Sequence, residues 1–180
     1  MGDALGALSG RIPLVVFVVH GTKKLLARVG SPGQDAGGRS TTALGDWYAT
    51  ALFWRPQVAL FVNEPTLLPV LMPLAPAATL TKRFPTALAD VLAAHGVSRS
   101  FIDGEVARMD DCELARTENR SVVGIMNEFS RLAETYRVSS AEADLVPLAL
   151  RLALTPCGPL YNRHVSPDRE LAAVIARHAR

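Results

Sequence analysis

The sequence predicts an α+β domain in which a mostly antiparallel sheet of about four to five strands packs against five to six helices. Two observations predict this class. Short apolar runs rich in β-branched and aromatic residues, separated by turn formers, fill much of the first 72 positions, and the apolar period changes from two to 3.6 near residue 80. The 180 residues fit one domain. We expect a flexible extension at residues 1–11 and a single domain over residues 12–180.

Composition and charge place the chain among ordinary globular proteins. Hydrophobic residues make up 49% of it and charged residues 20%, and 19 basic against 17 acidic side chains give a formal net charge of +2. A chain so close to neutral has no bulk field for nucleic acid or a membrane surface. Its two cysteines, Cys112 and Cys157, lie far apart without a Cys-x-x-Cys pair, so we expect reduced thiols and a cytoplasmic location.

No membrane segment is expected. The apolar run at residues 14–19 is six residues long, ends at His20 and has no small-residue cleavage site, so a buried strand is a better interpretation than a signal peptide. The apolar stretch at residues 66–80 is too short to span a bilayer and contains three prolines.

A buried strand and a short helix are predicted at the start of the domain. Residues 12–19 form a continuous β-branched run, which is typical of a central strand. The helix is expected at residues 23–29, with Thr22 as its N-cap. The glycine-rich segment at residues 30–42 predicts a surface loop.

Three consecutive strands are predicted next, at residues 46–54, 57–63 and 66–72. Turn-forming residues separate them, so consecutive antiparallel pairing is the economical topology. Pro69 cannot donate to a strand ladder, and the third strand is therefore expected at an edge of the sheet or to end early.

The remaining sequence has mainly helical periodicity. We expect a helix that ends at Gly96, a helix that begins after Ser98, a short half-exposed strand around residues 112–114, and helices at residues 119–137, 144–154 and 167–178.

The helix at residues 119–137 has two distinct faces. Its apolar side predicts a core face, formed by Val122, Ile125, Met126, Phe129, Leu132, Ala133 and Tyr136. The opposite side carries Arg120, Gly124, Asn127 and Arg131. Gly124 costs about 1 kcal/mol relative to alanine in a helix interior. Two interpretations stay open: a solvated outer face, or a contact surface on which Gly124 lets a ligand or another backbone approach closely.

Lysines follow the first predicted strand directly. Thr22, Lys23 and Lys24 stand at a strand-to-helix turn, where backbone N–H groups favour a phosphate or carboxylate. The glycine pattern of a phosphate-binding P-loop is missing there. The alternative is that Thr22 caps the helix and both lysines are solvated.

Other polar groups carry weaker signals. Cys157, in a proline-rich loop, has His164 seven residues later, but a buried loop cysteine is the simpler interpretation. The pair Asp110 and Asp111 has the chemistry of a general acid and base or of a magnesium ligand, and is as well explained by a solvated turn. The four histidines lack metal-binding spacing, so we expect no metal and no cofactor.

Four segments also occur in an order that is similar to a known family. They are Thr22-Lys23-Lys24-Leu25-Leu26, Gly45-Asp46-Trp47-Tyr48-Ala49, Val58-Ala59-Leu60-Phe61-Val62-Asn63 and Asn119-Arg120-Ser121-Val122-Val123-Gly124-Ile125-Met126-Asn127. Over roughly residues 14–175 the chain resembles a bacterial family of unknown function, whose members are also found beside or fused to plasmid ORF-3-like transposon passenger proteins. His20 stands where that family commonly has cysteine. The resemblance implies an association with mobile elements and no known activity.

We favour a non-catalytic interaction module that binds a protein partner or a small anionic ligand. Its contacts would be the turn at Lys23 and Lys24 and the face from Arg120 to Asn127. The complete set of candidate contacts is Thr22, Lys23, Lys24, Trp47, Asn63, Arg120, Gly124 and Asn127.

Two alternatives stay open. In the first, an enzyme for a phosphorylated or nucleotide substrate clamps phosphate with Lys23, Lys24 and Arg120 and uses Asp46 or Asp111 as acid or base. In the second, the protein is a weak nucleic-acid binder. The near-neutral charge weighs against the second, because phosphate contacts dominate such affinity.

Overall fold

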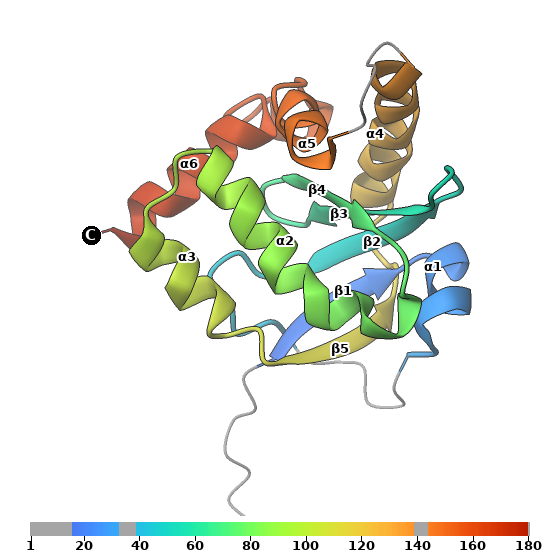
Figure 1. Ribbon diagram of the computed structural model, residues 1–180. Coiled ribbons are helices and arrows are strands. Elements are labelled where there is room, and N and C mark those ends of the chain that lie inside the picture. The colour runs from blue at the N-terminus through green and yellow to red at the C-terminus, as the bar shows by residue number, and fades with distance from the viewer. Residues whose placement is uncertain (1–15, 33–38, 139–143, 180) are drawn as a thin grey trace, which may run out of the picture.

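The computed structural model describes residues 16–32, 39–138 and 144–179. In this part of the chain a five-stranded sheet has the order β4-β3-β2-β1-β5 (Figure 1). Its strands are β1 (Val16–Gly21), β2 (Trp47–Leu52), β3 (Val58–Asn63), β4 (Pro69–Pro73) and β5 (Asp111–Arg116). The predicted extension at residues 1–11 and the middle of the predicted glycine-rich loop lie outside the described residues.

The second, third and fourth strands pair as predicted. β2 is antiparallel to β3, and β3 is antiparallel to β4. β4 begins at Pro69 and lies at the edge of the sheet, where a residue without an N–H leaves no gap in the ladder. The predicted antiparallel meander is confirmed.

β1 forms parallel ladders on both of its sides. It pairs with β2 from Val19 onward, and along its whole length with β5, from Val16 opposite Asp111 to Gly21 opposite Arg116. No sequence pattern assigned these neighbours. A parallel pair needs a long crossover, which the helices between β4 and β5 supply.

Six α-helices accompany the sheet in the described residues. They are α1 (Lys23–Val29), α2 (Leu80–Ala94), α3 (Arg99–Val106), α4 (Arg120–Val138), α5 (Leu145–Ala153) and α6 (Pro167–His178), with short 3-10 turns at Ala77–Thr79 and Gly158–Leu160. The predicted α+β class is confirmed, and the predicted helices lie within one or two residues of those observed. None of the described helices has the length and apolarity that a bilayer crossing requires.

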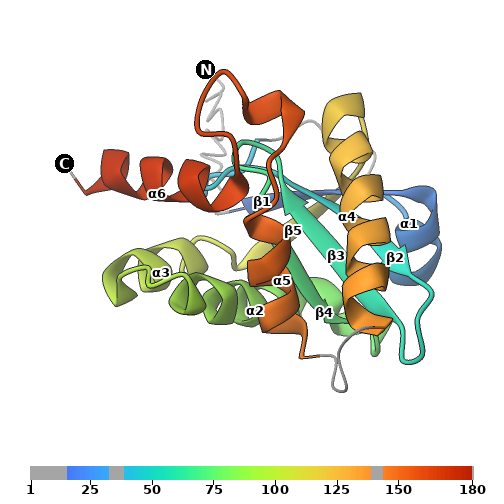
Figure 2. The same ribbon diagram turned by 90° about the horizontal axis from the view of Figure 1, so that it is seen from above.

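α2 and α4 lie on opposite faces of the sheet (Figures 1 and 2). On the α2 face, the ring of Phe84 contacts Phe17, Trp47 and Phe61, with centroids 5.9, 5.0 and 4.1 Å away. Full burial of each such side chain contributes about 1.5–3 kcal/mol. On the other face α4 packs against β2 and β3, while α5 runs along β4 and contacts both α2 and α4.

α4 has the core face that its periodicity predicts. Val122, Met126, Phe129 and Ala133 are buried, and the opposite side of the helix is exposed. α4 covers β2 and β3. Polar side chains gather beside it, on the same face of the sheet over β1 and β5.

Candidate functional site

A polar pocket of about 530 Å³ lies on the α4 face of the sheet, over β1, β5 and the start of β2. We call it the His20 pocket. The side chains that matter for its chemistry are His20, Arg39, Asp46, Tyr48, Glu64 and Glu118. The β1–β2 register sets His20 opposite Tyr48, which brings residues from distant parts of the sequence onto one surface.

His20 is held at both ring nitrogens. Its Nδ1 lies 2.9 Å from the main-chain carbonyl oxygen of Arg116, and its Nε2 lies 3.2 Å from Oδ2 of Asp46. A carbonyl only accepts, so Nδ1 must carry a proton. The ring also stacks on Tyr48, with centroids 4.6 Å apart and planes inclined by 16°. The imidazole is thereby fixed in position and in orientation.

The surroundings favour the charged forms of both partners. Burial alone lowers the pKa of His20, but hydrogen bonds to Asp46 and to the Arg116 carbonyl, with the negative charges of Asp46 and Glu64, outweigh burial and raise this pKa above 6.5. Burial alone raises the pKa of Asp46, but hydrogen bonds from His20 and Ser40 outweigh it and lower this pKa below 3.8. The two acceptors at the ring nitrogens and both pKa directions therefore favour an imidazolium paired with a carboxylate.

The segment that carries Asp46 is tied to β1. The backbone N–H of Ser40 donates to Oδ1 of Asp46 at 3.0 Å, and Oγ of Ser40 accepts from the N–H of Val18 at 2.8 Å. Gly45 supplies a left-handed backbone, with φ of 74°, immediately before Asp46.

Asn63 supports the same segment from β3. Its side chain is fully buried, and its amide donates to the carbonyl oxygens of Leu44 at 2.9 Å and Asp46 at 3.2 Å. Its Oδ1 accepts from both the N–H and the hydroxyl of Thr66. The donors and the acceptor of this buried amide thus all form hydrogen bonds that hold the loop before β2 and the turn after β3.

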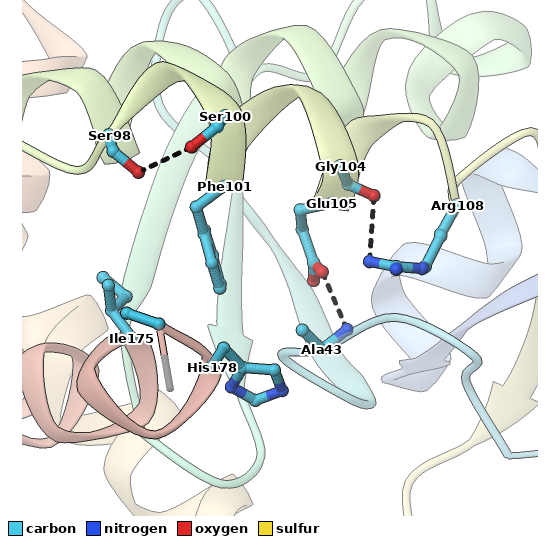
Figure 3. A pocket seen from close by; sticks show the side chains of 10 residues that line it. Ala43, Ser98, Ser100, Phe101, Gly104, Glu105, Arg108, Ile175 and His178 are labelled. Atoms are coloured by element: carbon cyan, nitrogen blue, oxygen red, sulfur yellow. Dashed lines mark hydrogen bonds between the residues drawn. The ribbon is translucent and has the colours of Figure 1, made fainter.

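Glu105 of α3 supports the segment from a third direction. Its carboxylate is 1% exposed and accepts from the N–H of Ala43 at 2.7 Å and of Leu44 at 3.0 Å. Figure 3 shows it reaching Ala43 from α3, inside a second, smaller pocket of about 300 Å³ that Phe101 and His178 flank. Burial raises the pKa of Glu105, and its bonds to the two N–H groups only partly offset this.

The other charges of the His20 pocket are mostly negative. Glu64 accepts from Nδ2 of Asn119 at 3.0 Å and from the hydroxyl of Tyr48 at 3.5 Å. Glu118 and Arg39 are exposed. Because Asp46 and the His20 imidazolium neutralise each other, two carboxylates face a single arginine.

A strained turn borders the pocket. Leu67 is buried and has φ of 59°, a left-handed backbone that residues other than glycine rarely adopt. It follows Glu64 and Pro65, which line the pocket. Such a conformation costs on the order of 1–3 kcal/mol and persists only where the surroundings enforce it. The buried bonds of Asn63 and Thr66 enforce it here.

The lysines of the predicted anion turn are separated in space. Thr22 occupies the N-cap position of α1 but makes no capping bond, since its hydroxyl donates to Thr50 at 2.9 Å. Lys23 lines a crevice with Arg116, while Nζ of Lys24 lies 5.8 Å from the centre of the Phe53 ring. Thr22 is thus the N-cap residue as predicted, but it makes no side-chain capping bond because a cross-strand partner binds its hydroxyl.

Two candidate contacts are closed to a ligand. Trp47 is fully buried on the α2 face against Phe84, and Asn63 is fully buried in the hydrogen bonds described above. Both residues therefore act inside the fold, which corrects their interpretation as ligand contacts. Asn63 still matters for the site because it positions Asp46.

The polar side of α4 is exposed as predicted. Arg120, Gly124 and Asn127 all face solvent, and a Cβ added at Gly124 would meet nothing within 4 Å. The glycine therefore has no packing reason among the described residues. Whether this face binds a ligand or partner stays a prediction.

Neither the Cys157 thiol nor the pair Asp110 and Asp111 has surroundings typical of a catalytic group. Cys157 is buried, its Sγ lies 3.4 Å from the carbonyl oxygen of Thr155, and burial together with the charge of Glu128 raises its pKa to about 12. Such a thiol is not a nucleophile near neutral pH. Asp110 and Asp111 are both exposed, Asp110 immediately before β5 and Asp111 as its first residue. The described residues contain no group of three or more potential metal ligands.

Sequence reasoning missed the centre of the pocket. It named Asp46 only as an alternative acid or base, and His20 only as a departure from the resembling family. One available signal was the position of His20, a polar residue that ends an apolar strand next to a glycine. Its partners could not be found locally, because Asp46 is 26 residues away and Arg116 is 96 residues away.

Comparison with known proteins identifies a family whose function is unknown. A family model described as "Domain of unknown function (DUF6933)" matches residues 18–170, a range that includes every residue of the His20 pocket. No curated protein and no solved structure matches the chain.

Proposed function

The chain belongs to this family of unknown function, and we propose that it is a non-catalytic binding domain that holds a small polar ligand in the His20 pocket. The ligand is recognised by the carboxylates and the ordered ring system of the pocket.

The observation that carries the proposal is that neither ring nitrogen of His20 is free. A general base needs a nitrogen lone pair within reach of the substrate proton. Here Nδ1 is bonded to the carbonyl of Arg116, and Nε2 faces the carboxylate of Asp46. A histidine held in this way has no lone pair free to act as a general base, which supports recognition over base catalysis.

The charges of the pocket indicate which ligand it suits. With Asp46 neutralised by His20, Glu64 and Glu118 outnumber Arg39. A ligand with an ammonium or guanidinium group would complete this arrangement, because each carboxylate keeps acceptor capacity for N–H groups. The buried bonds of Asn63 and Glu105 support the proposal further, since they hold in place the loop that forms one wall.

The protonation of His20 can be measured directly. In a ¹⁵N NMR titration of the imidazole, both nitrogens should be protonated at pH 6.5, with a midpoint above that of a free histidine. An unprotonated Nε2 at that pH, together with a ring N–H proton that exchanges rapidly with solvent, would be evidence for a base and against the proposal.

Ligand class can be tested with putrescine and agmatine as probes and succinate as the anionic counterpart, at constant ionic strength. The amines should shift the NMR signals of His20 and Tyr48, and Glu118→Gln should weaken binding about threefold, as expected for an exposed ion pair. Asp110→Asn, which removes an exposed charge outside the pocket, is the matched control. Stronger binding of succinate in this pocket would refute the ligand class.

A second candidate function is protein contact through the polar side of α4. The supporting observation is the open surface at Gly124. A matched pair of variants tests it on any partner that co-purifies with the chain: Asn127→Ala should release the partner and Asp90→Ala, on the exposed side of α2, should not. Equal retention by both variants would remove this candidate.

We also propose a cytoplasmic location in a bacterium and an association with mobile elements. The first is supported by two free cysteines, and both by the family resemblance of the sequence. Fractionation of a native host should place the chain in the cytoplasm, and its gene should neighbour transposon passenger genes more often than randomly chosen genes do.

A further inference from the structure

A third opening lies at the carboxyl ends of β1 and β5. It is a crevice of about 560 Å³ whose lining includes Gly21, Lys23, Leu26, Pro32, Arg116 and Thr117. We call it the Lys23 crevice. Its lining side chains are distinct from those of the His20 pocket, and only the main-chain carbonyl of Arg116 serves both regions.

The topology explains why a crevice forms there. β1 and β5 are adjacent and parallel, but β1 leads into α1, which contacts the turn before α2, whereas β5 leads into α4 on the opposite face. The chain therefore leaves two neighbouring strands in opposite directions. Ligands of open α/β sheets bind at such a point, outside the carboxyl ends of the strands.

The crevice brings two positive charges together. Lys23 is the first residue of α1 and Arg116 is the last residue of β5, and both are exposed. Among the described lining residues none is acidic, and neither cation forms an ion pair in the described part of the chain. Two like charges over one opening repel each other, so an anion between them is favoured.

The binding is assigned to side chains of the crevice. The N–H of Thr22, at the start of α1, already donates to the carbonyl of Ala49 at 2.9 Å. Gly21 lets α1 lie against the strand end, because a Cβ there would stand 2.8 Å from Leu26. Leu26, Ala27 and Pro32 then form an apolar wall beside the two cations.

We infer that the Lys23 crevice binds a small organic anion, a carboxylate on a short apolar chain, with Arg116 and Lys23 pairing with the carboxylate and Leu26 packing against the chain. The guanidinium offers two parallel N–H donors that match a carboxylate. The inference goes beyond the ligand of the His20 pocket and needs none of its side chains.

The test is an NMR titration with sodium acetate, butyrate and hexanoate at constant ionic strength. Signals of Gly21, Lys23 and Thr117 should shift, and affinity should rise by about fourfold for each methylene group that becomes buried. Arg116→Gln and Lys23→Gln should each weaken hexanoate binding about threefold, as expected for an exposed ion pair. Lys24→Gln, which removes a neighbouring charge that lies over Phe53, should leave it unchanged.

Three outcomes would overturn the inference. They are an affinity independent of chain length, an equal loss in Lys24→Gln, and tighter binding of inorganic phosphate than of hexanoate. All three variants alter exposed side chains, and Arg116→Gln keeps the carbonyl that holds His20. Unchanged His20 ring signals in that variant therefore separate a failure here from a failure of the proposed function.

Discussion

The amide of Asn63 donates to the main-chain carbonyl of Asp46 at 3.2 Å, so a fully buried residue of β3 fixes the backbone of the residue that pairs with His20. Asn63→Ala should therefore lower the free energy of unfolding by about 2–4 kcal/mol, because several buried backbone and hydroxyl groups lose their partner at once. Urea denaturation measures the change. Asn127→Ala, at an exposed position of α4, is the control and should stay within about 0.5 kcal/mol of the parent.

The His20–Asp46 pair should make stability depend on pH. The folded pKa of His20 is raised above 6.5, so its contribution is complete below pH 6.5 and is lost as the pH rises through the folded value. The folded pKa of Asp46 is lowered below 3.8, so its contribution is present above pH 3.8 and is lost as the pH falls through the folded value. The pair stabilises the fold most between these two reference values.

The measurement compares urea denaturation at pH 5.5 and pH 8.5. The parent should lose more stability over this interval than His20→Gln, in which no imidazolium can be lost. Groups that titrate in both proteins, Glu105 among them, cancel in the comparison. Identical pH profiles would show that His20 has an ordinary pKa.

The carboxylate of Glu105 should stabilise the loop in front of β2. Glu105→Gln keeps one acceptor oxygen but turns an amide toward backbone N–H groups, so we expect a loss of about 1–3 kcal/mol. Hydrogen exchange at the amides of Ala43 and Leu44 should become faster. Asp103→Asn, on an exposed part of the same helix, should change neither quantity.

Gly124 and Gly96 should respond in opposite directions to the same substitution. A Cβ meets nothing within 4 Å at either position, but Gly96 has φ of 74° whereas Gly124 is a regular helical residue. Gly124→Ala should stabilise the protein by up to about 1 kcal/mol through helix propensity. Gly96→Ala should destabilise it by about 1 kcal/mol because of its left-handed backbone. Thermal or urea unfolding of both variants checks the pair, and a destabilised Gly124→Ala would reveal a contact at that position.

Both cysteines should be nearly inert in the folded protein. Burial is the first cause that raises the pKa of Cys112 and of Cys157, in each case to about 12. Iodoacetamide at pH 8 should therefore label them slowly in buffer and rapidly in urea. Fast labelling of Cys157 in buffer would restore it as a candidate nucleophile.

Local periodicity was sufficient to predict most of the elements. The antiparallel meander, the position of Pro69 at an edge and the core face of α4 each follow from residues that are neighbours along the chain. The parallel pairing of β1 with β5 does not, since it depends on how α2 and α3 return the chain across the sheet.

The candidate site was harder to predict for the same reason. Glu105 meets Ala43 across 62 residues, and Tyr48 meets the N–H of Asn119 across 71 residues. Each contact depends on strand register and helix placement, which a single sequence does not display. Lys23 could be selected because its charge follows a strand, but its neighbour Arg116 could not.

The β1–β5 ladder also sets an order of assembly. β2, β3 and β4 are joined by short turns and can pair as soon as they emerge from a ribosome. β1 can pair with β5 only after the chain has been synthesised beyond Asp111, the partner of Val16. The His20 pocket and the Lys23 crevice both need residues from β5 or just after it. A nascent chain should therefore acquire its recognition surfaces late, and fragments that stop before β5 should bind none of the probes named above.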